Sequence, residues 1–411
     1  MDDRPSYYEF FAGGGMARAG LGEGWRCLFA NDFDAKKAQS YRANWGGEHL
    51  HVGDVGKVET SQLPGTADLV WASFPCQDLS LAGGGAGLTG ERSGTFWPFW
   101  ALMKKLGAEQ RAPKLIVLEN VCGALTSHGG RDFTELCKAL AGQGYRFGAL
   151  VIDAALFVPQ SRPRLFIVAA REDAVIPAAL AALDRPCERS EAVRGGKAAS
   201  GSPRRVARRN DGGSEASLFF TRALLAAQEK LPAKLREKWL WWRMPAPPLR
   251  NTTLAELIED APQDVAWRSR AETQTLLAMM SDVNLEKLEA AKRTGQRMVG
   301  TLYRRTRCEG GRRKQRAEAR FDDVAGCLRT PAGGSSRQYV LEVERGETRS
   351  RLMSARETAR LMGLPDAYLL PARYNDAYHL TGDGVVAPVV RHIAAHLLEP
   401  LLLAQRFCVA A

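Results

Sequence analysis

Short apolar runs alternate with amphipathic stretches over the first 170 residues of the chain. The expected strands are Tyr7–Phe11, Arg26–Asn31, Leu69–Ala72, Leu115–Leu118, Phe147–Ile152 and Leu165–Ala169, and helices are expected at Ala35–Trp45, Phe96–Leu106 and Phe133–Ala141. Apolar runs separated by amphipathic helices are typical of a parallel sheet covered by helices. We therefore predict an α/β fold with a doubly wound, Rossmann-like sheet, which binds its ligands at the carboxyl ends of the strands.

The pattern changes after Arg171. A stretch rich in Gly, Ser and Arg at Arg194–Ser217 predicts a loop or insertion. Helical spacing returns at Leu218–Trp242, at about Arg270–Thr294, at Arg356–Met362 and at Val385–Leu403. We divide the chain into a first domain of residues 1–172, a second, smaller domain of residues 173–374, and a segment of residues 375–411 that returns to the first domain.

The charge is unevenly distributed. The chain has 57 Lys and Arg against 46 Asp and Glu, a formal net charge of +11. Between Arg185 and Arg320 there are 29 Lys and Arg against 16 Asp and Glu, whereas the remaining residues are close to neutral with 28 against 30. A localised basic block suits a phosphate-rich partner, because each neutralised phosphate releases counterions.

Composition also bears on the compartment. The eight cysteines are scattered and form no Cys-x-x-Cys pair, so the chain shows neither a disulfide framework nor a zinc-binding spacing, and no metal is expected. The chain begins without a basic start followed by an apolar run, and no uninterrupted apolar stretch reaches the ~18 residues of a membrane span. We expect a cytoplasmic protein with no membrane partner.

A glycine turn follows the first expected strand. Phe11-Ala12-Gly13-Gly14-Gly15 would let a ligand approach the backbone, and Asp32, at the end of the next strand, could accept bonds from ribose hydroxyls. Arg18 stands where a dinucleotide fingerprint needs a small residue, which favours a nucleoside ligand without a pyrophosphate. Asp54 could bond an adenine amino group. A plain structural turn and a loop-capping aspartate are the alternatives.

A cysteine follows the strand Leu69–Ala72. Proline at position 75 fixes the backbone just before Cys76, at the mouth of a strand, where a thiolate can be exposed as a nucleophile. The glycine-rich stretch that continues to Gly94 could close over a substrate as a lid. Most single cysteines are small buried hydrophobic residues, and this alternative stays open at this point.

An acid and two arginines complete the candidate chemistry. Glu119 ends the apolar strand Leu115–Leu118, where desolvation would raise its pKa and suit it to hold or donate a proton. Arg162 and Arg164 flank Pro163 at the start of another strand, and guanidinium groups suit phosphate or a base carbonyl. A core glutamate and solvated surface arginines are the competing interpretations.

These blocks, in this order, resemble the DNA (cytosine-5) methyltransferase family. The resemblance covers about Tyr7 to Ala170 and Arg351 to Leu398, and leaves the middle for the family's variable target-recognition domain. Phe74-Pro75-Cys76-Gln77 matches the nucleophile motif, Glu119-Asn120-Val121 the acid motif, and Gln160 to Arg164 the motif whose second arginine contacts the flipped base. The predicted sheet is accordingly that of a methyltransferase.

The resemblance also implies a cofactor pocket for S-adenosylmethionine. It assigns cofactor contacts to Phe11, Ala12, Gly13, Gly14, Gly15, Asp32, Phe33, Asp54, Val55, Pro75 and Asp383. Phe33 would stack on the adenine. Three positions depart from the family pattern: Asp32 stands where Glu is usual, Asp383 where Asn is usual, and Gly384 where Ser or Ala is usual. The two departures in the last motif leave its cofactor contacts open.

In the implied reaction the Cys76 thiolate adds to carbon 6 of a flipped-out cytosine, so that carbon 5 can accept the methyl group. Glu119 would bond N3 and the exocyclic amine, and Arg164, with Arg162, would hold the base carbonyl or its phosphate. The expected DNA contacts are Gln77, Ser80, Arg204, Arg205, Arg304, Arg305, Arg312 and Arg313. For any one of these arginines, a solvated surface is the alternative.

The expected partner is double-stranded DNA, the expected state is a monomer, and a cognate restriction endonuclease would act separately. The rival within the same chemistry is a tRNA cytosine-5 methyltransferase. A nucleic-acid-binding protein without catalysis is disfavoured because Cys76 and Glu119 are both present. A nicotinamide-dependent oxidoreductase is disfavoured by Arg18, and it offers no role for Cys76 beside a basic domain.

Overall fold

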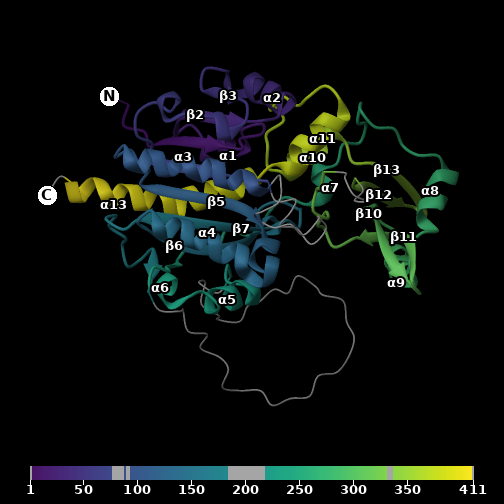
Figure 1. The fold of residues 1–411 in the computed structure, drawn as a ribbon. Helices are drawn as coiled ribbons and strands as arrows, with labels where there is room; N and C mark the ends of the chain where they lie inside the picture. Colours follow the sequence, from purple (N-terminus) through teal and green to yellow (C-terminus); the bar gives the residue numbers. More distant parts are fainter. Residues whose placement is uncertain (1, 76–87, 89–92, 184–217, 331–336, 410–411) are drawn as a thin grey trace, which may run out of the picture.

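A computed structural model describes residues 2–75, 88, 93–183, 218–330 and 337–409 (Figure 1). Within these ranges a seven-stranded sheet has the order β3-β2-β1-β4-β5-β7-β6. Its strands are β1 (Ser6–Phe10), β2 (Arg26–Asp32), β3 (Leu50–Val52), β4 (Leu69–Ala72), β5 (Leu115–Val121), β6 (Tyr145–Asp153) and β7 (Pro163–Arg171). The predicted fold class is confirmed.

Successive side chains of the central strands enter two different cores. On β5, Leu115 and Val117 belong to one core, and Ile116 and Leu118 belong to the other. Strands buried on both faces read as continuous apolar runs, which is why the sequence pattern identified them. The helices that border the sheet are α1 (Met16–Leu21), α2 (Ala35–Trp45), α3 (Phe96–Ala108), α4 (Arg131–Gly142), α12 (Ala387–Ile393) and α13 (Glu399–Val409).

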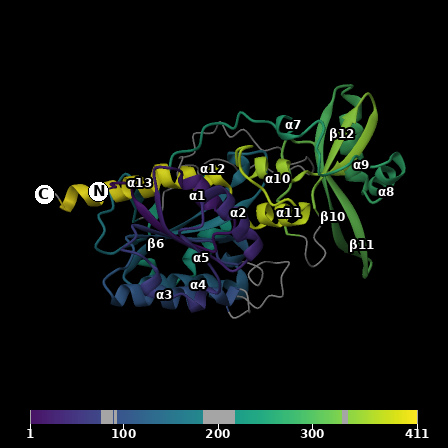
Figure 2. The same ribbon diagram turned by 90° about the horizontal axis from the view of Figure 1, so that it is seen from above.

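Helices from the two ends of the chain share one face of the sheet. Figure 2 shows α1, α12 and α13 on one side and α3 and α4 on the other. Met16 and Leu21 of α1 pack in the same core as Val390 of α12 and Leu401 of α13. Gly20 faces Val390 so closely that a Cβ at position 20 would lie 2.4 Å from the Val390 Cβ. The last helices of the chain are therefore part of the core of the large sheet.

Strand β7 runs antiparallel to both of its neighbours, β5 and β6, which corrects the expectation of a parallel sheet at this edge. Only residues 154–162 connect β6 to β7. A parallel connection needs a crossover of about a dozen or more residues, usually with a helix, so this short connection can only return the chain in the opposite direction.

Residues just after the 184–217 gap pack on the large sheet. Phe147 of β6 donates its N–H to Lys238 O at 3.0 Å and accepts from Leu240 N–H at 2.7 Å. The tryptophan-rich stretch thus lies along the edge strand β6, although the sequence division placed it in the second domain. This stretch contains α5 (Arg222–Glu229), α6 (Ala233–Arg236) and β9 (Trp241–Trp242), which pairs with β8 (Ala181–Ala182).

The second domain is built on an antiparallel sheet of order β11-β10-β12-β13. Its strands are β10 (Met298–Glu309), β11 (Arg312–Arg320), β12 (Tyr339–Glu344) and β13 (Glu347–Leu352), and the helices around it are α7 (Leu254–Leu257), α8 (Arg270–Leu277) and α9 (Asp282–Arg293). Leu288 of α9 and Leu302 of β10 share its small core. The chain then returns to the large core through α10 (Ala355–Leu361) and α11 (Tyr374–Asp383).

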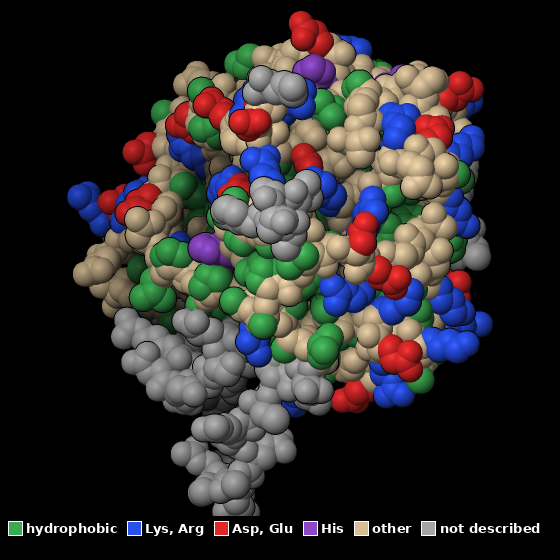
Figure 3. All heavy atoms as spheres, turned by 90° about the vertical axis from the view of Figure 1, so that its left-hand side faces the viewer, with side chains coloured by type: hydrophobic (Ala, Val, Ile, Leu, Met, Phe, Trp, Pro, Cys, Tyr) green, Lys and Arg blue, Asp and Glu red, His purple; other side chains and the backbone are tan. Residues whose placement is uncertain are grey.

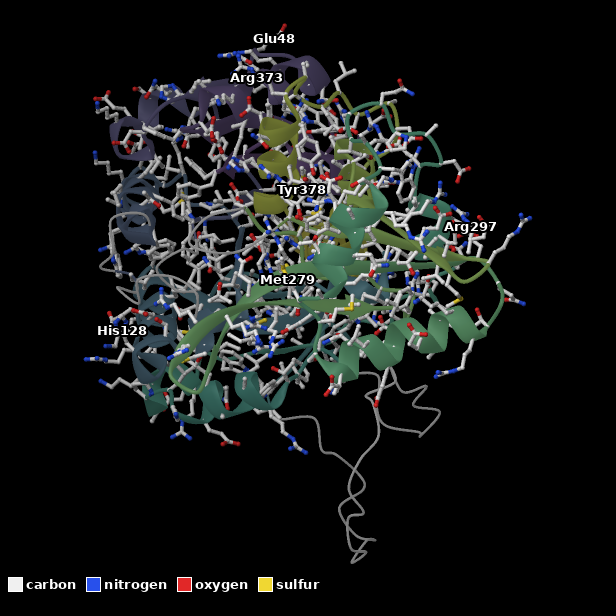
Figure 4. The ribbon with its side chains drawn as sticks, turned by 90° about the vertical axis from the view of Figure 1, so that its right-hand side faces the viewer. Glu48, His128, Met279, Arg297, Arg373 and Tyr378 are labelled. Carbon is white, nitrogen blue, oxygen red and sulfur yellow. The ribbon has the colours of Figure 1, made fainter. Side chains whose placement is uncertain are left out.

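Figure 4 looks onto the second domain, with Arg297 near its edge, where it pairs with Glu342 and Asp260. Figure 3 shows the opposite end of the molecule, where basic and acidic side chains are interspersed over the visible face. Among the described residues, one helical run, Tyr374–Arg406, is long and apolar enough to span a membrane, but 67% of its apolar window is buried inside the protein. That burial is what a core helix requires.

Candidate active site

The glycine turn connects β1 to α1, and protein contacts alone account for two of its glycines. The Gly14 carbonyl accepts from Trp45 Nε1 at 3.0 Å and from the Tyr368 hydroxyl at 2.7 Å. A Cβ at Gly14 would lie 2.3 Å from the Tyr368 oxygen, and one at Gly15 would lie 2.4 Å from Trp45 Nε1. Gly13 has a φ of 56°, a left-handed conformation that suits glycine, and a Cβ there would meet only Lys37 Cδ, at 4.0 Å.

Asp32 lies at the end of β2, beside this turn. Its carboxylate accepts from the Gly13 N–H at 2.7 Å and from the Asp34 N–H at 2.8 Å. Burial raises the pKa of Asp32, although Lys37 opposes this rise. The neighbouring Phe33 ring is 78% exposed, which is unusual for a phenyl group. A fixed carboxylate beside an exposed aromatic ring suits a ribose and its base.

Two more expected cofactor residues border the same edge. The exposed Asp54 caps a short 3₁₀ helix, Val55–Lys57, by accepting from Gly56 N–H at 2.8 Å, so the loop-capping interpretation describes at least one of its oxygens. Val55 is buried in the core with α3. Phe11 adopts a φ of 59°, which is rare outside glycine, and its ring lies edge-on to Phe99.

The last motif reaches the turn from the far end of the chain. Asp383 pairs with Lys37 Nζ at 2.7 Å and accepts from the Thr330 hydroxyl. Burial would raise the pKa of Asp383, but Lys37 and Thr330 hold it below its ordinary value. A Cβ at Gly384 would lie 2.1 Å from the Met16 sulfur, so the methionine occupies the space that a Ser or Ala side chain would need.

Glu119, the expected acid, lies on β5, the strand that pairs with β4. Glu119 is 7% exposed, and burial raises its pKa against the opposing effects of Arg164, Arg162 and a hydrogen bond with Ser73. Asn120 Nδ2 donates to Phe74 O at 3.1 Å and so ties β5 to the chain that leads into Pro75. Cys76, Gln77, Ser80 and most of the expected lid lie outside the described residues.

The two arginines of the β7 start have different surroundings. The Arg162 guanidinium is buried and donates to the carbonyls of Leu328, Gly382 and Gly384 at 2.7, 2.8 and 2.7 Å. Arg164 instead points its Nε to within 3.4 Å of Glu119 Oε1. Arg162 therefore joins three chain segments, whereas Arg164 is the arginine that faces the acid.

The described arginines expected to bind DNA lie on the hairpin of β10 and β11. In its register Arg305 lies opposite Arg316, and Arg307 lies opposite Lys314. Arg305 and Arg312 share one face, whereas Arg304 and Arg313 lie on the other, where Arg304 stacks over the Tyr339 ring. Arg204 and Arg205 lie outside the described residues.

The profile of the family described as C-5 cytosine-specific DNA methylase matches residues 6–399. The chain belongs to this family. It is a DNA cytosine-5 methyltransferase, as the sequence resemblance implied.

Individual relatives agree with this assignment. The type II methyltransferase M.BsuFI of Bacillus subtilis is 25% identical over 402 residues, which are 97% of this chain and 74% of that protein. M.Eco47II of Escherichia coli is 33% identical over 168 residues, covering 40% of this chain and 39% of that protein. Among solved structures, the Entamoeba histolytica methyltransferase EhMeth has a TM-score of 0.59 at 12% identity and covers 97% of this chain and 99% of that one, which shows the fold.

The sequence alone did not point to two residues that contact the candidate site residues. Lys37 lies in the first turn of α2 and pairs with Asp383, and only its place five residues after Asp32 hinted at a role. Cys327 approaches Arg162, and its only sequence signal is its place two residues before the basic Arg329. Within the described residues, no group of His, Cys, Asp and Glu side chains is arranged to hold a metal ion.

Proposed function

We propose that this enzyme methylates carbon 5 of a cytosine flipped out of duplex DNA, through a transient bond between Cys76 and carbon 6. The observation that supports it most is the buried Glu119 with Arg164 beside it, one strand from the chain that leads into Cys76. A carboxyl group that keeps its proton can donate to a ring nitrogen of a base, and a guanidinium can hold a carbonyl or a phosphate.

The edge of β1 and β2 fits S-adenosylmethionine. Asp32 would accept from the ribose hydroxyls, the exposed Phe33 ring would stack on the adenine, and Asp54 would accept from its amino group. The remaining members of the pocket would be the 11–15 turn, Val55, Pro75 and Asp383. When bound, the cofactor supplies an electrophilic methyl group on a sulfonium centre.

The protein groups would act on the base in sequence. The Cys76 thiolate adds to carbon 6, and Glu119 donates a hydrogen bond to N3 as negative charge develops on the ring. Arg164 holds the base or its phosphate in place. After carbon 5 is methylated, its proton passes to water, the double bond between carbons 5 and 6 forms again as the bond from sulfur to carbon 6 breaks, and Cys76 is released as the thiolate.

The second domain would supply the DNA contacts. We define the basic face of the hairpin as Arg305, Arg307, Lys314 and Arg316, which lie in opposed pairs on β10 and β11. Glu318 on this face already pairs with Arg307. A cavity of about 420 Å³ lies between this face and α9 and is bordered by Lys287 and Tyr303. Such closely spaced cations suit a phosphate backbone, and a neighbouring hollow lined by polar groups suits contacts to the bases.

The likeness to proteins named type II methyltransferases supports a restriction endonuclease of matching specificity as a separate partner. We further propose that the enzyme acts on DNA as a monomer.

The direct test is transfer of a labelled methyl group to duplex DNA and, in parallel, to tRNA. We expect label in the duplex alone, at carbon 5 of cytosine in a single sequence context that sequencing of 5-methylcytosine identifies. Duplex DNA carrying 5-fluorocytosine should become trapped on Cys76 in the presence of the methyl donor. Labelling of tRNA alone would overturn the DNA assignment, and an active enzyme that never traps the fluorinated base would overturn the covalent step.

A further inference from the structure

The segment that follows β11 is fastened to the chain just before β7. Ala325 accepts from Ser161 N–H at 2.9 Å and donates to Pro159 O at 2.8 Å. Leu328 N–H donates to the buried Gln160 Oε1 at 3.1 Å. These bonds fix the backbone on both sides of Cys327 against the start of β7, where Arg162 and Arg164 lie.

The Cys327 sulfur lies among cationic groups. Arg162 Nη1 lies 3.6 Å from it, and the neighbouring Arg164 is close enough to interact with it electrostatically. Burial would raise the pKa of this thiol, but Arg162, Arg164 and Arg329 together hold it below its ordinary value. Cys122, in contrast, has its pKa raised to about 11 by burial. The arginines thus make Cys327 more acidic than an ordinary thiol, and its Sγ donates to Leu328 O at 3.3 Å.

The two arginines that share this sulfur differ in freedom. Arg162 is fixed by three carbonyl oxygens. Arg164 instead lies 3.4 Å from Glu119, donates to the Pro163 carbonyl at 2.9 Å, and interacts with the Cys327 sulfur. A long side chain with several rotatable bonds needs such an anchor to keep one orientation.

We propose that Cys327 is a positioning residue of the methyl-transfer site: its sulfur, shared between Arg162 and Arg164, fixes the Arg164 guanidinium against Glu119. This inference rests on the proposed function, because it gives Arg164 and Glu119 their roles at the base. The segment that follows β11 of the second domain would then contribute one side chain, Cys327, that orients the catalytic groups.

The test is a double-mutant cycle of Cys327→Ala and Arg164→Ala, measured as kcat and KM for methyl transfer to duplex DNA. We expect Cys327→Ala to lower kcat roughly 10- to 100-fold, because small displacements of a positioned group have effects of this size. KM for the methyl donor should change by less than about threefold. In the Arg164→Ala background the same substitution should have no further effect, because the group that it positions is gone.

The matched control is Cys137→Ala, which removes the same atoms from a fully buried thiol of α4. Its kcat should equal that of the unaltered protein. Cys327→Ser replaces the alanine variant if that variant does not fold. It should lower kcat in the protein that retains Arg164 and have no further effect in the Arg164→Ala variant. An unchanged kcat, or an equal loss with and without Arg164, would overturn the inference while the unaltered enzyme still methylates DNA. An unaltered enzyme that methylates no DNA would instead refute the proposed function.

Discussion

The molecule contains two groups of basic residues that differ in their surroundings. At the start of β7, Arg162 and Arg164 are held by carbonyls, a thiol and a carboxylate, and Arg162 is 2% exposed. On the hairpin, Arg305 and Lys314 are exposed. A group that acts on one atom of a base must keep one orientation. Cations that bind a phosphate backbone each add to the affinity, and none of them needs a fixed orientation. Under the proposed function, the same residue type serves chemistry in one region and association with DNA in the other.

The largest effect should come from the nucleophile. Cys76→Ser should abolish turnover, because a serine hydroxyl is not ionised near neutral pH, while DNA affinity, which depends on the hairpin, stays largely unchanged. Methyl transfer and DNA binding should be measured on the same preparation. Substantial residual methylation would refute the role of the thiol. A parallel loss of DNA binding would contradict the assignment of catalysis and DNA binding to separate regions.

The next effect concerns the acid. Glu119→Gln should lower kcat by about 10²- to 10⁴-fold, the range for loss of a positioned proton donor, with a modest effect on binding. Because burial raises the pKa of Glu119, the protonated and active form persists to higher pH than for a free glutamic acid. In the unaltered enzyme kcat should fall as pH rises through that pKa. The Gln variant, which cannot ionise, should lack this alkaline limb, and a retained limb would assign it to another group.

Substitutions of Arg162 and Arg164 should differ in their effect on thermal stability. Arg162→Ala removes the guanidinium that donates to three carbonyls, at about 1 kcal/mol each, and should lower the thermal midpoint by several degrees. Arg164→Ala is the matched control and should lower kcat with little change in the midpoint. Equal midpoints for the two variants in a thermal melt would contradict the clamp assigned to Arg162.

The smallest effect belongs to a single hairpin cation. Lys314→Ala should weaken binding to all DNA sequences alike and reduce the slope of log K against log salt by about one. Arg26→Ala is a suitable control, because this exposed arginine lies at the amino end of β2, away from the site edge. A change in sequence preference with an unchanged salt slope would show instead that Lys314 contacts bases.

Much of the catalytic sheet could be predicted from sequence because its strands are continuous apolar runs that end in polar residues. The run from Leu115 to Leu118 gave both β5 and the position of Glu119 at its end. The short connection before β7 could have indicated its direction. The hydrophobic pattern alone does not show whether a strand runs parallel or antiparallel to its neighbours. The contact of Cys327 with Arg162 joins residues 165 positions apart, and no local spacing encodes it.

The hairpin shows a different limit. Its basic residues were found from charge alone, yet only the strand register divides them into two faces and pairs Arg305 with Arg316. Asp383 stood out as a departure from the family pattern, but its partner Lys37 became evident only from the fold, because the pair joins the two ends of the chain.

The reversal of β7 determines where its first residues emerge. Because the strand is antiparallel, Arg164 lies opposite Val121, two residues beyond Glu119. Had the chain crossed over and entered in parallel, β7 would begin beside Leu115, roughly 20 Å along the sheet at about 3.3 Å per residue. A nine-residue return without an α-helix thus brings a guanidinium to the acid, and lengthening that connection enough to invert the strand would leave the carboxyl group without its cationic neighbour.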